Sequence, residues 1–459
     1  MRNFYKRLVP SCDRAAMVLL CVLMADCCIF GSGRLIEFGS IGFRMALLFV
    51  PLLVSLPLML SKLRGLLRSP FLWMLAAFAL WLAVCTVMGI RNGNSRTILA
   101  ADLKGFAYFA LLPAALCILS SRQRVYTLMR VMMYASLALA LLHVAYLIVH
   151  LSSSSLYYSL YSAGLSSNFS RIGTITSKIP RLFFNSEMYL LCGCAFPMYF
   201  YVRGERKRFY PAMAGLCLFA ILLSYTRSVY LGAFLAAVGC VLALALGGSA
   251  QDRKRLGIFL AVAVLIFSCI TCAFSLTQDT EYFGFGLTRT LVSLQDPDET
   301  EATEPSETTP EETDAEQIQQ DAYITQTISS DQLRAETMAE LLAHIQSSPI
   351  IGLGLGAGLS VRGDGEGFNE YFYLDLWAKT GLIGLILYLL PVFWMGWTWL
   401  RSREKRSVCK AVWLSVLLGF LAFSFFNPYM NASLGVLMYC CVMAVFAVPG
   451  EAVQAQNNT

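Results

Sequence analysis

Residues 228–247 (SVYLGAFLAAVGCVLALALG) and 256–276 (LGIFLAVAVLIFSCITCAFSL) are apolar runs on either side of a short segment that contains Arg253, Lys254 and Arg255. Each run has about the 20 apolar residues that a helix needs to cross a bilayer. In lipid only helices and closed barrels satisfy every backbone group, and barrel strands alternate over about ten residues. These two runs therefore predict transmembrane helices.

The rest of the chain repeats this pattern. Its 459 residues are 57% hydrophobic and 14% charged, which excludes an ordinary soluble domain. We predict an all-α polytopic membrane protein with about 12 transmembrane helices. The expected spans are 15–31, 42–60, 70–89, 103–119, 126–149, 187–202, 209–225, 228–247, 256–276, 374–399, 410–426 and 431–448. We expect the first to remain as a helix, because the later loops then pair well, rather than to be removed as a signal peptide.

Loops rich in Lys and Arg alternate with loops that are poor in them. The basic clusters lie within 62–68, 122–124, 203–208, 253–255 and 401–406. Short basic loops next to transmembrane helices stay in the cytoplasm, so we predict that both termini are cytoplasmic. Two long segments, 151–186 and 277–369, are then expected on the opposite side of the membrane.

The charge pattern divides the chain into three predicted parts: a membrane domain with nine helices (1–276), an extracytoplasmic loop (277–369), and the last three helices with a cytoplasmic tail (370–459). Within the loop, residues 296–321 hold 11 of the 29 acidic residues and no Lys or Arg, which predicts disorder. Residues 331–346 predict an amphipathic helix. Its apolar stripe is formed by Leu333, Met338, Leu341, Leu342 and Ile345.

Two arginines stand out on the predicted outer side. Arg334 would share a helix face with the apolar Met338, Leu341 and Ile345, and a guanidinium there favours an anionic partner. The alternative is that Arg334 reaches the membrane surface and pairs with a lipid headgroup. Arg227 lies in the short break between two spans, in the sequence SYTRS at 224–228. Its outward position opposes the usual inward preference of arginines and requires a reason.

Other basic residues on the same side favour a pocket for phosphate groups as a set, although each alone is typical of a surface charge. They are Arg34, Arg44, Arg91, Arg96, Lys104, Arg171, Lys178, Arg181, Arg289 and Arg362.

We predict no bound metal and no cofactor, because the three histidines and the 15 cysteines show no metal-ligand spacing. The glycines of 352–358 predict a sharp turn rather than a nucleotide site, since no Gly-Lys-Ser/Thr follows. Asp375 and Lys379 are four residues apart, a spacing that predicts an ion pair on one helix face, and a structural role for this pair is at least as well supported as a catalytic one.

In layout, the chain resembles the O-antigen ligase and O-antigen polymerase superfamily of bacterial membrane glycosyltransferases. Three short motifs carry this resemblance: Thr226-Arg227-Ser228; Arg334 followed by PIIGLGLG at 349–356; and Glu370-x-x-Tyr373-Leu374 followed by GLIG at 381–384. Ligases of this family usually place a functional His where this sequence has Glu370. That difference favours the polymerase branch over the ligase branch.

The resemblance implies metal-independent transfer of a glycan from a polyprenyl-pyrophosphate carrier to an acceptor sugar hydroxyl, outside the bacterial cytoplasmic membrane. The product would be a surface polysaccharide such as capsule or exopolysaccharide. Arg227 and Arg334 would stabilise the departing pyrophosphate, with Arg171 and Arg181 as helpers. Glu370 would accept or orient the proton of the acceptor hydroxyl.

The aromatic residues Tyr371 and Tyr373 would stack on sugar rings in the same interpretation. Other polysaccharide-assembly proteins are expected partners, and nucleic acid is not. Two alternatives remain open: ligase-type transfer of a finished glycan to a different acceptor, and a lipid-linked oligosaccharide flippase or transporter. The chain shows no clear internal repeat and few ionisable residues at mid-span, Asp26 and Arg130 among them, which counts against a transporter.

Overall fold

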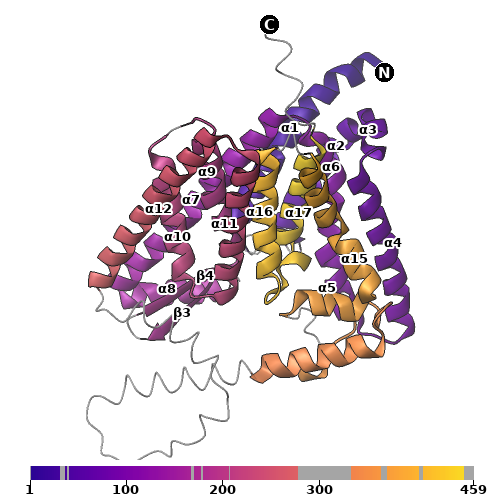
Figure 1. The fold of residues 1–459 in the computed structure, drawn as a ribbon. Helices are drawn as coiled ribbons and strands as arrows, with labels where there is room; N and C mark the ends of the chain where they lie inside the picture. The colour runs from indigo at the N-terminus through magenta and orange to yellow at the C-terminus, as the bar shows by residue number, and fades with distance from the viewer. Residues whose placement is uncertain are drawn as a thin grey trace, which may run out of the picture.

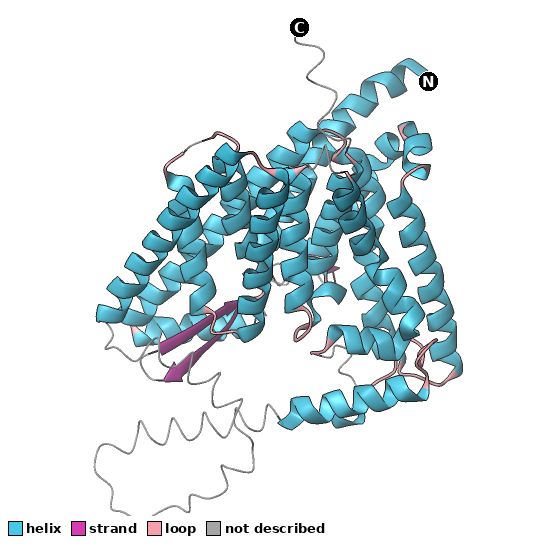
Figure 2. Cartoon of the chain, viewed as in Figure 1, coloured by secondary structure: helices cyan, strands magenta, loops and turns pink. Residues whose placement is uncertain are grey.

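The computed structural model describes residues 2–31, 37–38, 41–166, 170–176, 179–205, 207–277, 332–362, 370–402 and 407–448. In these residues the chain is almost wholly helical, with two short β-hairpins (Figure 2). The acidic segment 296–321, predicted to be disordered, lies outside the described residues, as do Arg34, Lys178 and Arg289.

Long helices run side by side and form one bundle (Figure 1). In chain order the elements up to residue 184 are α1 (Arg2–Ile29), β1 (Glu37–Phe38), β2 (Ile41–Gly42), α2 (Phe43–Ser61), α3 (Leu63–Leu67), α4 (Pro70–Arg91), α5 (Arg96–Ala107), η1 (Tyr108–Leu111), α6 (Leu112–Ile118), α7 (Arg122–Ser152), α8 (Ser154–Ser166), β3 (Ser170–Thr176) and β4 (Ile179–Phe184). The later elements are η2 (Glu187–Tyr189), α9 (Leu190–Val202), α10 (Phe209–Leu223), α11 (Arg227–Gly247), α12 (Ala250–Thr277), η4 (Ser360–Arg362), α15 (Phe372–Arg401), α16 (Val408–Phe423), η5 (Pro428–Asn431) and α17 (Ser433–Ala447).

Several of these helices have the length and composition of membrane spans. In the described part of the chain, six are long and apolar enough to cross a bilayer: Pro70–Arg91, Arg96–Ile118, Arg122–Ser152, Arg227–Gly247, Ala250–Phe274 and Phe372–Arg401. Shorter apolar helices include Leu47–Ser61, Phe209–Leu223, Val408–Phe423 and Ser433–Ala447. The predicted helical architecture with several candidate membrane spans is confirmed, whereas the number of about 12 spans and the large extracytoplasmic loop stay predictions.

The basic loops gather at one end of the bundle. Arg255 donates from Nη1 to the carbonyl of Val202 over 2.8 Å, and Lys62 donates to the carbonyl of Cys117 over 3.1 Å. Figure 1 places the start of α1 and the last residues of α17 at this end, which we call the terminal end. The opposite end, where the β3–β4 hairpin lies, is called the loop end. Which end faces the cytoplasm remains the prediction made from the charge pattern.

Small residues let the helices at the centre approach closely. A Cβ added at Gly232 of α11 would lie 2.7 Å from the carbonyl oxygen of Gly419 in α16, so neither position has room for a larger side chain. Helices in lipid associate largely through such tight packing, because lipid tails are as apolar as the side chains themselves. This contact joins the segment that carries Arg227 to the last helices of the chain.

The β3–β4 hairpin is an element that the pattern of long apolar runs did not predict. Its strands are antiparallel and pair Arg171 with Phe183 and Gly173 with Arg181. Ile172, Thr174 and other β-branched residues favour strands here. The hairpin belongs to segment 151–186, which we expected only as a long external stretch.

Candidate functional site

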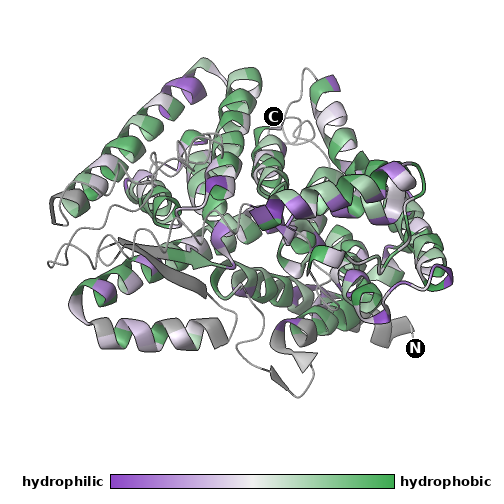
Figure 3. Ribbon diagram, turned by 90° about the horizontal axis from the view of Figure 1, so that it is seen from below, coloured by the Kyte–Doolittle hydropathy of each residue, from purple (hydrophilic) through white to green (hydrophobic). Residues whose placement is uncertain are grey.

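The first component of the site is a helix over residues 332–347, which we call the loop helix. Figure 3 looks onto the loop end and shows this helix lying across the ends of the bundle. Leu341 and Ile345 are buried against Leu359 and Ala378. The other members of the predicted apolar stripe differ, since they are about 40% exposed: Leu333, Met338 and Leu342.

The buried face of the loop helix is rotated from the predicted one. Thr337 is buried, as are Leu341 and Ile345, and these three residues form the face that packs on the bundle. Thr337 is three residues after Arg334 and therefore its neighbour on the helix surface. The prediction counted apolar residues only, so it included the exposed Met338 and Leu342 in the packed face and omitted the buried Thr337. The consequence is that Arg334 lies at the edge of the packed face and not in open water.

Arg334 and Glu370 come together at the loop end. The Nε of Arg334 donates to Oε2 of Glu370 over 2.7 Å, although the two residues are 36 positions apart. Their side chains are 40% and 32% exposed. A substrate can therefore reach both groups without a change in the bundle. Both were predicted as site residues on separate grounds, and the structure places them in one ion pair.

A glycine-rich turn connects the loop helix to the bundle. Gly352, Gly354 and Gly356 have φ values of +76°, +87° and +82°, which residues with a Cβ rarely adopt. The amide of Leu353 donates to the carbonyl of Ala378 over 2.9 Å, and the amide of Leu355 donates to that of Cys85 over 3.0 Å. The predicted sharp turn is present, and it lies between α4 and α15.

Helix α15 is interrupted where this turn reaches it. Gly381 has φ +67° and ψ 179°, which are not helical. Beyond the break, the amide of Leu382 donates to the carbonyl of Pro349 over 3.0 Å, so the turn replaces a hydrogen bond that the helix lost. Irregular backbone at membrane depth is tolerated only where protein satisfies it. The turn and the broken helix therefore depend on one another.

A buried charge cluster lies just before this break. Lys379 Nζ is 2.9 Å from Oδ1 of Asp102 and 3.0 Å from Oδ2 of Asp375. The amide of Gly356 also donates to Asp102 over 3.0 Å. The predicted Asp375–Lys379 ion pair is confirmed, but the role of Asp102 was missed. Through Asp102, the Lys379 ammonium connects α5 and the glycine turn to α15, which begins two residues after Glu370.

The loop helix has a second tether through Glu340. Its Oε1 accepts from the amide and the hydroxyl of Ser360 over 2.7 and 2.8 Å, and Oε2 accepts from the amide of Val361 over 3.2 Å. Burial on its own would raise the pKa of Glu340, but these hydrogen bonds outweigh it and lower the pKa. The tether is therefore lost only as the pH falls below the usual titration range of a glutamate.

The two predicted sugar-stacking tyrosines have different surroundings. The hydroxyl of Tyr373 donates to the carbonyl of Leu421 over 2.8 Å, and its ring centroid is 4.6 Å from that of Phe425. Tyr371 is half-buried, with its ring centroid 6.4 Å from that of Phe426. Phe425 and Phe426 are more than half exposed and are a part of this surface that sequence reasoning missed. Both tyrosines are half-buried, and the hydroxyl of Tyr373 is bound to the backbone of α16.

Arg227 lies at the same end, and one turn connects it to the other site residues. It is the exposed first residue of α11 and follows Tyr225, whose φ of +45° is unusual for a residue other than glycine. The adjacent Ser228 accepts a 2.8 Å hydrogen bond from Asn427. The turn 425–427 therefore contacts α11 beside Arg227 on one side and Tyr371 and Tyr373 on the other.

Arg171 and Arg181 belong to the β3–β4 hairpin, where their backbones are two positions apart along the ladder. The hairpin is held to the bundle just after β4, because Ser186 donates to the carbonyl of Ile29 over 3.1 Å and Tyr429 donates to that of Asn185. These contacts place the backbone of both predicted helpers at the loop end.

Two buried polar contacts at or near this end were not predicted. His143 Nε2 is 2.9 Å from Oε2 of Glu187, and both side chains are fully buried. Arg44 Nε is 2.8 Å from Oδ2 of Asp26. Arg44, which is 3% exposed, is thus a structural partner of Asp26 and is removed from the set of outward-facing cations.

These observations define a class: a helical protein with candidate membrane spans, in which an Arg–Glu pair joins a loop helix to the segment before α15 and an exposed arginine begins α11. Residues 212–389 match the family model of O-antigen ligase. This match confirms the resemblance to the O-antigen ligase and polymerase superfamily, and the matched segment contains Arg227, Arg334 and Glu370. Arg171 and Arg181 lie outside it. No curated protein matches the chain.

The matched segment covers less than half of the chain, and it is similar to enzymes of one general type. Members of this family are glycosyltransferase-like enzymes of polysaccharide biosynthesis, and their substrates are lipid-linked glycans and saccharides. Together with its apolar helices, the match indicates a protein of the bacterial inner membrane. In the described residues no three His, Cys, Asp or Glu side chains gather in a way that could hold a metal ion.

Proposed function

We propose that the protein polymerises repeat units of a surface polysaccharide, by moving a glycan from a polyprenyl-pyrophosphate carrier to a sugar hydroxyl outside the cytoplasmic membrane. The observation that supports this most directly is the 2.7 Å contact between Arg334 and Glu370 in the segment that matches O-antigen ligase. A cation that binds phosphate and a carboxylate that accepts a proton are the two groups that such a transfer requires.

The ion pair suggests an order of events. A pyrophosphate that enters the site competes with Glu370 for the guanidinium of Arg334, because arginine binds phosphate through two parallel hydrogen bonds. Glu370, released from Arg334, then accepts the proton of the acceptor hydroxyl. The hydroxyl oxygen bonds to the anomeric carbon, and the bond between that carbon and the pyrophosphate oxygen of the carrier breaks. Its electron pair leaves on the pyrophosphate, which Arg334 and Arg227 stabilise.

The position of the histidines supports a polymerase over a ligase. Ligases of this superfamily usually have a functional His where this chain has Glu370, and the nearest candidate in the loop helix is His344. It is ten residues from Arg334, which is about 15 Å along a helix axis. It lies one helical turn after Glu340, the residue that tethers the helix to Ser360. His344 is therefore poorly placed to replace the ligase histidine.

Deleting the protein is expected to leave lipid-linked single repeat units and no long polymer. The reason is that a polymerase acts after repeat units reach the outer leaflet and before chains grow. The measurement is the size and sidedness of the lipid-linked glycans, with a strain that expresses the intact protein from a plasmid as the control. Long chains that remain on lipid would instead indicate a ligase, and glycans trapped facing the cytoplasm would indicate a flippase.

A further inference from the structure

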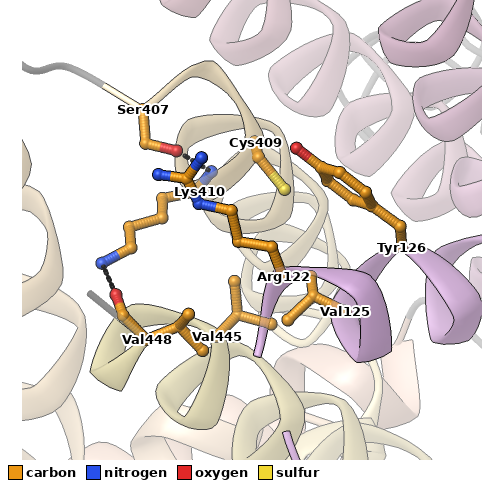
Figure 4. Close-up of a pocket in the computed structure, with 8 residues that line it drawn as sticks. All are labelled: Arg122, Val125, Tyr126, Ser407, Cys409, Lys410, Val445 and Val448. Carbon is orange, nitrogen blue, oxygen red and sulfur yellow. Dashed lines mark hydrogen bonds between the residues drawn. The ribbon is translucent and has the colours of Figure 1, made fainter. Parts of the chain in front are cut away.

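A pocket opens at the terminal end, on the opposite side of the bundle from the Arg334–Glu370 pair. It lies between the first residues of α7 and α16 and the last residues of α17 (Figure 4). Its lining residues are Arg122, Val125, Tyr126, Ser407, Cys409, Lys410, Val445 and Val448. No part of the proposed glycosyl transfer uses these residues, so the pocket requires a separate explanation.

The charges that line this pocket have one sign. Among the residues that the structure describes, Arg122 and Lys410 line it and no carboxylate does. Lys410 is already bound, because its Nζ donates to the carbonyl of Phe446 over 2.8 Å and to that of Val448 over 2.6 Å. Arg122 makes no hydrogen bond or ion pair with any residue that the structure describes. Two cations that face one space repel each other unless an anion lies between them.

Neutral donors surround the same space. The Oγ of Ser407 accepts from the amide of Lys410, so the hydrogen of this hydroxyl remains able to donate. The hydroxyls of Tyr126 and Tyr199 are 3.0 Å apart and share one hydrogen, which leaves a second for another acceptor. In Figure 4, Arg122 extends from α7 toward Ser407, and the hydroxyl of Tyr126 is directed to the same side.

The backbone adds to this preference for an anion. Arg122 is the first residue of α7, and Ser407 is the N-cap of α16. The amino ends of both helices carry partial positive charge and meet at the pocket. The carboxyl end of α17 also reaches it, but Lys410 neutralises that end by binding its last carbonyls. The remaining field is therefore positive.

We propose that this pocket binds a phosphate group, with Arg122 as its principal ligand and the hydroxyls of Ser407 and Tyr126 as further donors. Arginine is suited to this role because its guanidinium pairs with two phosphate oxygens at once. The phosphate can belong to a soluble anion or to the headgroup of an anionic phospholipid. Both sources present the same oxygens to these donors, and experiment separates them.

The test compares two variants of the full chain in phosphatidylcholine nanodiscs. Arg122→Gln removes the proposed ligand, and Arg64→Gln is the matched control, because Arg64 is an exposed cation at the same end that does not line the pocket. Inorganic phosphate is titrated at low ionic strength and its binding is followed by calorimetry. In parallel, nanodiscs that contain phosphatidylglycerol are prepared, and the phosphatidylglycerol that stays bound after extraction is measured by mass spectrometry.

Arg122→Gln is expected to weaken binding in one of the two arms about tenfold, while Arg64→Gln leaves it close to that of the unaltered protein. An effect on inorganic phosphate identifies a site for soluble anions, and an effect on phosphatidylglycerol alone identifies a headgroup site. Arg122→Lys, which retains the charge, is expected to recover part of the binding and shows that a loss is not caused by misfolding. If Arg122→Gln and Arg64→Gln behave alike with both probes, the proposal is wrong.

Discussion

Replacing Arg334 with alanine is expected to abolish polymer while the amount of protein in the membrane stays unchanged. The departing pyrophosphate would lose the guanidinium that stabilises its charge, and loss of one such fixed donor lowers a rate about 10²–10³-fold. Because the Arg334 side chain is 40% exposed, its removal leaves no cavity in the core. The measurement is the chain length of surface polysaccharide on gels, with an immunoblot for protein.

Two further variants sharpen this result. Arg334→Lys keeps the charge but not the planar fork, so polymer should be reduced rather than lost. Arg91→Ala removes another exposed guanidinium at the end of α4 and should have little effect. Polymer of normal length from Arg334→Ala would remove this residue from the mechanism.

Replacing Lys379 with methionine is expected to destabilise the fold strongly. Asp102 and Asp375, which are 3% and 4% exposed, would then share a buried space without a cation. Removing one partner of a buried ion pair costs about 3–5 kcal/mol, because it leaves charge that nothing compensates. The measurement is the thermal midpoint of the purified protein in mild detergent, together with its yield from membranes.

The matched control for this experiment is Lys104→Met, which removes an exposed lysine from the same helix that carries Asp102. Lys379→Met combined with Asp102→Asn should regain part of the stability, since one of the two buried charges is then absent. A thermal midpoint for Lys379→Met equal to that of the Lys104→Met control would show that the cluster does not support α15.

Some parts of the molecule could be predicted from the sequence because their signal is local. A continuous apolar run marks a membrane helix, as in α11 and α12. Glycines in close succession mark a sharp turn, as at 352–358. Arg334 was recognisable because a charge on an apolar stripe is unusual, and Glu370 because it precedes a helix among aromatic residues. For each of these residues, the neighbours in the chain were sufficient.

Other parts could not be predicted because their partners lie far apart in the chain. Asp102 and Lys379 are 277 residues apart, and His143 and Glu187 are 44 apart. A single Asp or Glu next to an apolar run indicates a buried carboxylate, but nothing nearby shows which cation it meets. The orientation of the loop helix depended in the same way on the packing of Leu341 against Ala378.

The central claim is that Arg227 and Arg334 lie on the outer side of the membrane, close enough to act on one pyrophosphate. In the structure both are at the loop end, and the turn 425–427 connects their surroundings. Cysteine replacements at 227 and 334 test this most directly, in a chain whose exposed Cys269 and Cys272 are replaced by serine. We predict that a membrane-impermeant maleimide labels both positions in intact cells and labels a cysteine at 64 only after permeabilisation. Labelling of 227 and 334 from opposite sides of the membrane would contradict the account.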